Sequence, residues 1–271
     1  MIDAETPMAD ATPQIRFDDG AAYERYMGTW SRLAGASFLD WLGPAKGSRW
    51  LDVGCGNGAF TEMIFDRCAP SSVDGIDPSE AQLAHARTRL AARGARFRVG
   101  DAMSLPFGDG TFDVAVMPLV IFFVPDPGKG VAEMARVVRG GGSVSAYAWD
   151  MDGGGFPYDA VLAEMRGLGL PVPTPPSASA SRLDSLRNLW TGAGLEAVET
   201  REITVRRTFA DFADYWATVL CAPSVGAKLS AMADAEVTPL RTRVRARLPA
   251  DTAGRIECTA RANAIRGRVR S

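Results

Sequence analysis

The stretch that decides the fold is WLDVGCGNGAF, residues 50–60. A short hydrophobic run leads directly into three alternating glycines, Gly54, Gly56 and Gly58, and the carboxylate of Asp52 precedes them. A strand followed by a glycine turn and a helix is expected to present unpaired backbone N–H groups and the positive end of the helix at one edge of a sheet. The glycines also satisfy the loose dinucleotide-binding pattern, so by themselves they leave the ligand open.

Strand-like and helical segments alternate around this turn. The predicted order is strand 49–54, helix 59–69, strand 72–77, helix 79–94, strand 96–101, strand 112–117, helix 130–140 and strand 143–150. Strands joined through helices of this length pair in parallel with right-handed crossovers. The sequence therefore predicts an α/β fold with a doubly wound, mostly parallel sheet.

Changes in composition and in the strand and helix pattern divide the chain into six parts. We expect a loose tail (1–15), an N-terminal helical cover (16–45), a binding core (46–150), a Pro/Gly-rich connection with a helix and a strand (151–206), a helical lid insertion (207–248), and a final strand and tail (249–271). The cover and the insertion both lie outside the alternating pattern. We therefore expect them to form a lid above the carboxyl edge of the sheet.

Composition favours a soluble globular protein with a small partner. Of the 271 residues, 46% are hydrophobic, and 30 basic against 32 acidic residues give a net charge of -2. With such a charge balance, no overall electrostatic attraction to nucleic acid or to an anionic membrane is expected. Cysteines 55, 68, 221 and 258 lack the close spacing of a zinc or redox site, which fits a reducing cytoplasm and predicts no metal. No apolar run is long enough to span a membrane.

Three acidic residues follow successive predicted strands. A carboxylate at Asp52 would repel the pyrophosphate of NAD or FAD, whereas S-adenosylmethionine carries an ammonium and a sulfonium and has no phosphate. Asp77 ends the second strand, where an acid takes the two ribose hydroxyls, and Asp101 ends the third, where it can accept from the adenine amine. Each acid could instead cap a helix or turn. Their concerted placement favours the cofactor interpretation.

Four segments carry a family resemblance. LDVGCGNGAF (51–60), VDGIDPSEAQLAHAR (73–87), FRVGDAMSLPFGDGTFDVAV (97–116) and EMARVVRGGGSVSAY (133–147) resemble the successive motifs of class I S-adenosylmethionine-dependent methyltransferases of the ubiquinone/menaquinone type, or methyltransferase type 11. The resemblance implies a Rossmann-like seven-stranded sheet with an antiparallel last strand. The run RGGG at 139–142 stands where the family usually has Arg-Pro-Gly-Gly, a departure that affects a turn.

The motifs and the resemblance together define an expected cofactor site. The residues expected to bind S-adenosylmethionine are Asp52, Gly54, Cys55, Gly56, Gly58, Asp77, Pro78, Asp101, Ala102, Met103, Met117 and Pro118. Methyl transfer is an in-line displacement that depends on holding the nucleophile roughly 3–3.5 Å from the methyl group and on keeping water out. A small, partly apolar substrate would then sit under the lid. Its expected pocket residues are Tyr26, Trp30, Phe122, Trp149, Tyr215 and Trp216.

No residue stands out as a general base. The single histidine, His85, lies within the helix after Asp77, where we expect a surface or packing role. Weaker candidates to take a proton are Tyr23, Tyr26, Tyr147 and Asp150, and no spacing singles one out. The sequence therefore favours methyl transfer without a histidine base or a metal.

Two other functions stay open at this point. An NAD(P)-binding oxidoreductase could share the open sheet, and a non-catalytic S-adenosylmethionine-binding module could keep the pocket without turnover. Nucleic acid is disfavoured as a substrate, because neither Asn/Asp-Pro-Pro-Tyr nor Pro-Cys follows the fourth strand. The acceptor atom (oxygen, nitrogen or carbon) and the oligomeric state do not follow from these patterns.

Overall fold

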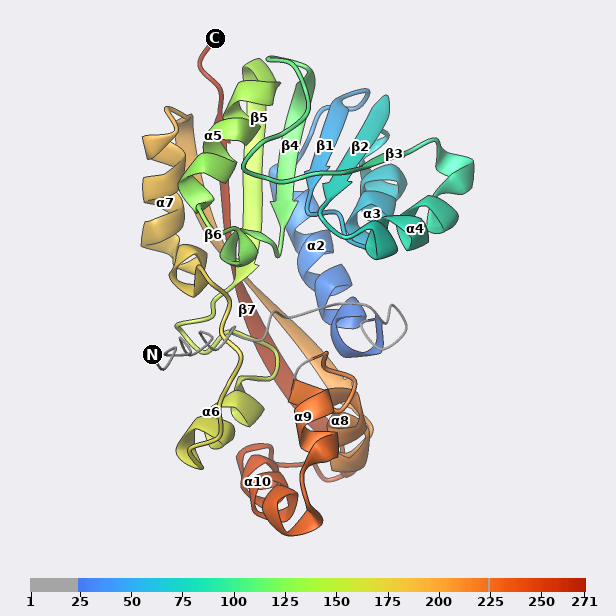
Figure 1. Ribbon diagram of the computed structural model, residues 1–271, viewed down its shortest axis with the longest axis vertical. Helices are drawn as coiled ribbons and strands as arrows, with labels where there is room; N and C mark the ends of the chain where they lie inside the picture. The colour runs from blue at the N-terminus through green and yellow to red at the C-terminus, as the bar shows by residue number, and fades with distance from the viewer. Residues whose placement is uncertain (1–23, 224) are drawn as a thin grey trace, which may run out of the picture.

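A seven-stranded sheet in the order β3-β2-β1-β4-β5-β7-β6 forms the centre of the computed structural model, which describes residues 24–223 and 225–271 (Figure 1). The strands are β1 (Arg49–Val53), β2 (Ser72–Asp77), β3 (Arg96–Val99), β4 (Phe112–Pro118), β5 (Val138–Trp149), β6 (Glu196–Phe209) and β7 (Ile256–Arg268). Strand β7 runs antiparallel to both of its neighbours, and the other pairs are parallel. The predicted mixed, doubly wound sheet is confirmed.

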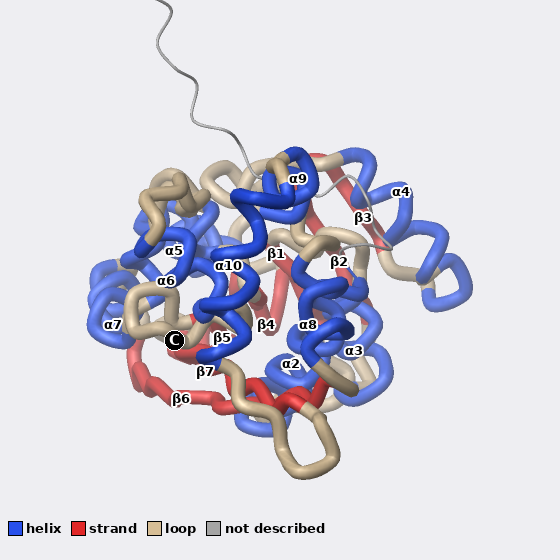
Figure 2. Tube along the Cα trace, turned by 90° about the horizontal axis from the view of Figure 1, so that it is seen from below, coloured by secondary structure: helices blue, strands red, loops and turns tan. Residues whose placement is uncertain are grey.

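Helices cover both faces of the sheet. They are α2 (Thr29–Leu42), α3 (Ala59–Cys68), α4 (Glu80–Arg89), α5 (Pro127–Val137), α6 (Asp159–Gly167), α7 (Leu183–Gly192), α8 (Phe212–Val219), α9 (Val225–Ala231) and α10 (Asp234–Arg247). Short turns of other helix types are η1 (Glu24–Gly28), η2 (Ala91–Arg93), η3 (Ile121–Phe123) and η4 (Ala178–Ser181). Helices α2 and α3 pack together on one face, and α5 and α7 on the other (Figure 2). No helix in the described ranges is long and apolar enough to cross a membrane.

Two elements begin earlier than the sequence predicts. Helix α5 begins at Pro127 rather than at residue 130, because Oδ1 of Asp126 accepts the N–H of Lys129 at 3.0 Å and caps the helix. Strand β5 begins at Val138 rather than at residue 143, because the glycine run forms an irregularity within the pairing with β4 instead of ending the strand.

One helix was not predicted. Helix α6 lies within the Pro/Gly-rich connection at 151–206, and it buries Val161, Leu162 and Met165. The apolar residues of this helix extend over only about two helical turns, and glycines and prolines flank them. That length is too short for a helical period to stand out in the sequence.

The helical insertion is carried on a two-stranded arm. Strand β5 ends at Trp149, opposite Ala262, so residues 256–260 of β7 pair only with β6 among the described strands. Figure 1 shows this arm extending past the sheet to α8, α9 and α10, on the side to which the parallel strands point. Strand β6 itself continues to Phe209, so the insertion begins a few residues after the predicted boundary at 207.

Candidate cofactor and substrate site

The glycine turn between β1 and α3 depends on glycine for its conformation and for a close contact. Gly54, Gly56 and Gly58 have φ angles of 74°, 51° and 80°, in the left-handed region that other residues rarely adopt. A Cβ on Gly54 would lie 2.4 Å from Cγ2 of Val120, in the loop that follows β4. The turn and this loop are therefore packed directly against each other.

The amides of the turn have partners within the protein. Those of Gly54 and Cys55 donate to the carbonyl of Ile76 at 2.7 and 3.0 Å, and that of Gly58 donates to the carbonyl of Cys55 at 2.9 Å. The expectation of unpaired amides at these positions is wrong, because the first two bonds continue the contact of β1 with β2 into the turn. The glycines contribute shape rather than a row of free donors.

Asp77 is positioned by two backbone amides. Its Oδ2 accepts the N–H of Gly56 at 3.0 Å and its Oδ1 accepts the N–H of Ser79 at 2.9 Å. Burial raises the pKa of Asp77, and these two hydrogen bonds oppose the rise. Because each carboxylate oxygen can accept two hydrogen bonds, both oxygens retain capacity for a pair of hydroxyl groups.

Asp52 lies beneath the turn and is fully buried. The hydroxyl of Thr61 donates to its Oδ2 at 2.7 Å, whereas Oδ1 has no hydrogen-bond partner among the described residues. Burial raises the pKa of Asp52 to about 7, with a further rise from nearby Asp77 and an opposing effect of Thr61.

The remaining residues expected at the cofactor lie around the same edge. Asp101 is exposed, and its Oδ1 accepts the N–H of Met103 at 2.8 Å, so it makes the turn that the alternative interpretation anticipated. Ala102 and Met103 are half-buried beside it. Cys55, Met117 and Pro118 are buried, and Pro78 is exposed.

An apolar cavity of about 100 Å³ lies beyond the end of β4. It is lined by Tyr26, Met27, Leu119, Phe122, Phe123, Trp149, Met151, Phe156, Leu162, Pro173, Pro175, Ala222, Pro223 and Val225. Tyr26, Phe122 and Trp149 were predicted for the pocket and do line it. Space of this size accommodates several water-sized groups, and its walls offer mainly aromatic and aliphatic contacts.

The other three predicted pocket residues do not line this cavity. Trp30, Tyr215 and Trp216 are buried in the packing around it, because their rings fill space between the N-terminal cover, the loop after β5 and helix α8. In their place the Pro-rich connection contributes Pro173 and Pro175. Sequence reasoning treated that segment only as a linker.

The cavity and the glycine turn share one wall, the segment at the exit of β4. Leu119 lines the cavity and adopts a φ of 60°, and its amide donates to the carbonyl of Tyr147 at 2.7 Å. The next residue, Val120, is the one that packs on Gly54. A left-handed conformation at a leucine costs about 1–2 kcal/mol, and such strain is concentrated at functional sites.

Tyr158 holds the N-terminal cover over this cavity, and sequence reasoning missed it. Its hydroxyl donates to the carbonyl of Tyr26 at 2.6 Å and accepts from Nε1 of Trp30 at 3.2 Å and from Arg207 at 3.4 Å. Its ring stacks on that of Tyr26 with centroids 4.4 Å apart. Burial raises the pKa of Tyr158 well above its usual range. The one sequence signal was a tyrosine within the glycine-rich run MDGGGFPYD.

The four candidate bases occupy different environments. Tyr147 is buried against Phe38, with ring centroids 4.8 Å apart. Asp150 is buried, forms an ion pair with Arg261 and accepts the N–H of Gly153 at 3.0 Å. Tyr26 lines the cavity.

Tyr23 falls outside the described residues. His85 is exposed on α4. The described residues also contain no group of three or more His, Cys, Asp or Glu that could hold a metal ion.

Comparison with known proteins identifies the core. Residues 51–146 match the family described as "Methyltransferase domain". These residues of the chain therefore form a methyltransferase domain. This methyltransferase domain is similar to the phosphatidylethanolamine N-methyltransferase of Cereibacter sphaeroides, with 41% identity over 104 residues that cover 37% of this chain and 50% of the relative.

Two further similarities fit the same domain. The ubiquinone/menaquinone biosynthesis C-methyltransferase of Roseobacter denitrificans is 35% identical over 115 residues, which cover 41% of this chain and 46% of the relative. The fold is similar to that of Haemonchus contortus phosphoethanolamine N-methyltransferase 2 in complex with S-adenosyl-L-methionine, with a TM-score of 0.58 and 18% identity over 94% of this chain and 58% of that one. The chain thus spans about half the length of the curated relatives it matches.

Proposed function

We propose that this protein transfers a methyl group from S-adenosylmethionine to a small, partly apolar metabolite by in-line displacement. The observation that carries the proposal is the shared wall at the exit of β4, where Leu119 lines the apolar cavity and Val120 packs on the turn at Gly54. A substrate in this cavity would be adjacent to a cofactor held at the turn. When bound, the cofactor supplies an electrophilic methyl group on a sulfur that leaves as a neutral thioether.

The residues of the site divide the work between binding and exclusion of water. The carboxylate of Asp77, fixed by two amides, would accept hydrogen bonds from the ribose hydroxyls. The negative charge of Asp52 would stabilise a cationic ligand above it. Tyr158 holds the cover that contributes Tyr26 to the cavity, so the network around its hydroxyl would keep water away from the acceptor.

Proton transfer does not require a histidine in this proposal. Among the four candidate bases, Tyr26 alone is a described residue that lines the cavity, and a phenol is a weak base near neutral pH. We therefore propose an acceptor that is already ionised or electron-rich at the start of the reaction. His85→Ala should leave turnover nearly unchanged, since that side chain is exposed on α4. A loss of turnover in a folded His85→Ala protein would overturn the base-free account.

Two measurements test the proposal. Isothermal titration should show binding of S-adenosylhomocysteine and none of NADH. Incubation with methyl-labelled S-adenosylmethionine and a panel of phenols, quinols and aliphatic amines should transfer the label to at least one compound, as read by mass spectrometry. Binding of NADH at the glycine turn would favour the oxidoreductase, and cofactor binding without transfer to any acceptor would favour the non-catalytic module.

A further inference from the structure

A second cavity opens at the other edge of the sheet. Its volume is about 470 Å³, and its lining comes from the C-terminal end of α2, the starts of β4, β5 and β6, and the end of β7. Parallel strands begin at this edge and end at the edge that carries the glycine turn. The two cavities are therefore separated by the length of the strands and are built from different residues.

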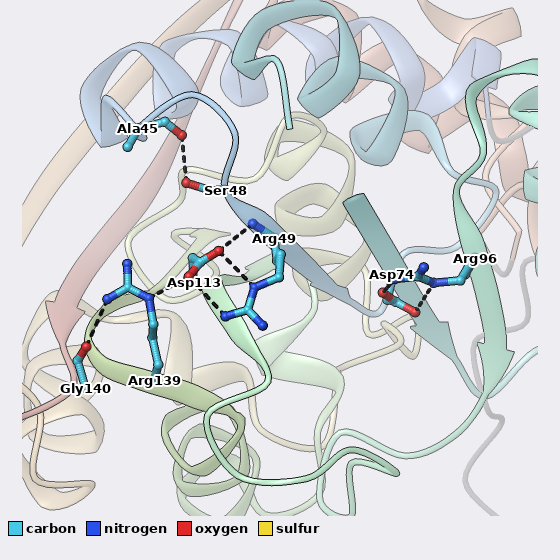
Figure 3. Close-up of polar contacts among 8 residues, drawn as sticks. All are labelled: Ala45, Ser48, Arg49, Asp74, Arg96, Asp113, Arg139 and Gly140. Carbon is cyan, nitrogen blue, oxygen red and sulfur yellow. Dashed lines mark hydrogen bonds and ion pairs between the residues drawn. The ribbon is translucent and has the colours of Figure 1, made fainter. Parts of the chain in front are cut away.

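Charged groups surround this second cavity. The carboxylate of Asp113 accepts from Nε of Arg49 at 3.2 Å and from Nε of Arg139 at 2.5 Å, so it lies between two guanidinium groups (Figure 3). Arg49, assisted by Arg139, holds the pKa of Asp113 well below its usual range. This carboxylate stays ionised, yet it offsets only one of its two cationic neighbours.

Two arginines on β7 add further positive charge. Arg266 donates to Oε2 of Glu199 at 2.8 Å and to the carbonyl of Trp41 at 2.9 Å, so it also neutralises the negative end of helix α2. Arg268 donates to the carbonyl of Gly141 at 3.1 Å and forms no ion pair with any described carboxylate. Among the residues that line the cavity, three carry a guanidinium group (Arg139, Arg266 and Arg268) and two carry a carboxylate (Asp113 and Glu199).

Two glycines of the run at 140–142, Gly141 and Gly142, form one wall of the cavity. A Cβ on Gly142 would lie 2.5 Å from Cγ1 of Val138 and 2.7 Å from the carbonyl oxygen of Asp113, so the backbone there packs too closely for a side chain. Gly141 has a φ of 73°. Both glycines line the cavity, so this wall consists of main chain.

We propose that this second cavity binds a small phosphorylated metabolite, with the phosphate group on Arg268 and the organic body in the space toward Trp41. A guanidinium presents several N–H donors in a planar fork that matches phosphate oxygens, and Arg268 uses one of its groups on Gly141. The excess of positive charge selects an anion, and the volume exceeds what a lone phosphate requires. The site is independent of the proposed methyl transfer.

The test compares charge-matched variants by calorimetry at low ionic strength. Inorganic phosphate, glucose 6-phosphate and uncharged glucose are titrated into the intact protein, into Arg268→Ala and into Arg270→Ala. Arg270 pairs with Glu196 at 2.6 Å and does not line the cavity, so its removal changes the net charge equally. Both phosphates should bind and glucose should not. Arg268→Ala should weaken glucose 6-phosphate binding at least tenfold, and Arg270→Ala by less than twofold.

Several results would overturn the proposal. These are absence of phosphate binding at millimolar concentration, equal losses in the two variants, inorganic phosphate binding without glucose 6-phosphate binding, and displacement of the phosphate ligand by S-adenosylhomocysteine. Equal losses would indicate a diffuse electrostatic field, and displacement would place the anion in the cofactor site. Unchanged affinity for S-adenosylhomocysteine in both variants would show that each is folded, and it separates this test from the fate of the methyltransferase proposal.

Discussion

Replacing Asp52 by Asn tests two effects of its buried charge: a lower free energy of unfolding and stronger binding of a cationic ligand. The carboxylate is fully buried, and burial raises its pKa to about 7 from an unfolded value of 3.8. Because the folded-state pKa is the higher one, ionised Asp52 opposes folding. The cost is absent below about pH 4, grows as the pH rises toward 7 and is complete above it.

The size of the effect follows from the two pKa values. At about 1.4 kcal/mol for each pH unit, the gap between about 7 and 3.8 corresponds to about 4 kcal/mol. The free energy of unfolding of the wild type should therefore fall relative to that of Asp52→Asn by about 4 kcal/mol between pH 4 and pH 8. Comparing slopes removes any constant cost of placing the amide beside Thr61.

Urea denaturation at several pH values measures this difference, and Asp113→Asn provides the control. Arg49 holds the pKa of Asp113 below its unfolded value, so Asp113 is ionised in the folded state throughout pH 4 to 8 and changes its ionisation in the unfolded state only near pH 4. Its variant should therefore add little slope over this range. A wild-type minus Asp52→Asn difference that stays flat over this range would refute the reasoning. We also expect Asp52→Asn to weaken S-adenosylmethionine binding more at pH 8 than at pH 5, because only ionised Asp52 stabilises the cationic ligand.

Three further substitutions test the turn, the tyrosine network and the ribose contact. Gly54→Ala should lower the free energy of unfolding, measured by urea denaturation, more than Gly43→Ala does. Both glycines have a positive φ, but only at Gly54 would the added Cβ collide with another side chain, that of Val120. Equal losses would contradict this close contact. Tyr158→Phe should lower the free energy of unfolding by about 1–3 kcal/mol, because it removes a hydroxyl with several hydrogen-bond partners. Tyr215→Phe should be neutral or stabilising, because its buried hydroxyl has no partner among the described residues. The reverse order would count against the network. Asp77→Ala should weaken S-adenosylhomocysteine binding by roughly 1.5–3 kcal/mol in calorimetry, and unchanged affinity would refute the ribose contact.

The strained exit of β4 links these observations to specificity. Leu119 is held at a φ of 60° between the apolar cavity and the residue that packs on Gly54. A movement of this segment would alter the cofactor turn and the cavity together. In the proposed function, selection among apolar acceptors would therefore depend on this segment as well as on the rings that line the cavity.

The sequence by itself determined the features that depend on residues close together along the chain. Hydrophobic periodicity predicted the order of strands and helices, which the structure confirms. The glycine turn, with Asp77 after the next strand, is the basis of the proposed cofactor edge. Each of these signals lies within a few consecutive residues. The prediction of free amides at the turn failed, since their partner, the carbonyl of Ile76, belongs to another strand.

Only the tertiary structure decided the cavities, the buried charge and the tyrosine network. The hydroxyl of Tyr158 meets the carbonyl of Tyr26 across 132 residues of chain, and the apolar cavity joins side chains from the N-terminal cover to helix α9. The raised pKa of Asp52 and the unpaired charge of Arg268 likewise depend on which distant groups surround them. Burial and charge compensation are sums over neighbours in space, and those neighbours are set by packing rather than by order along the chain.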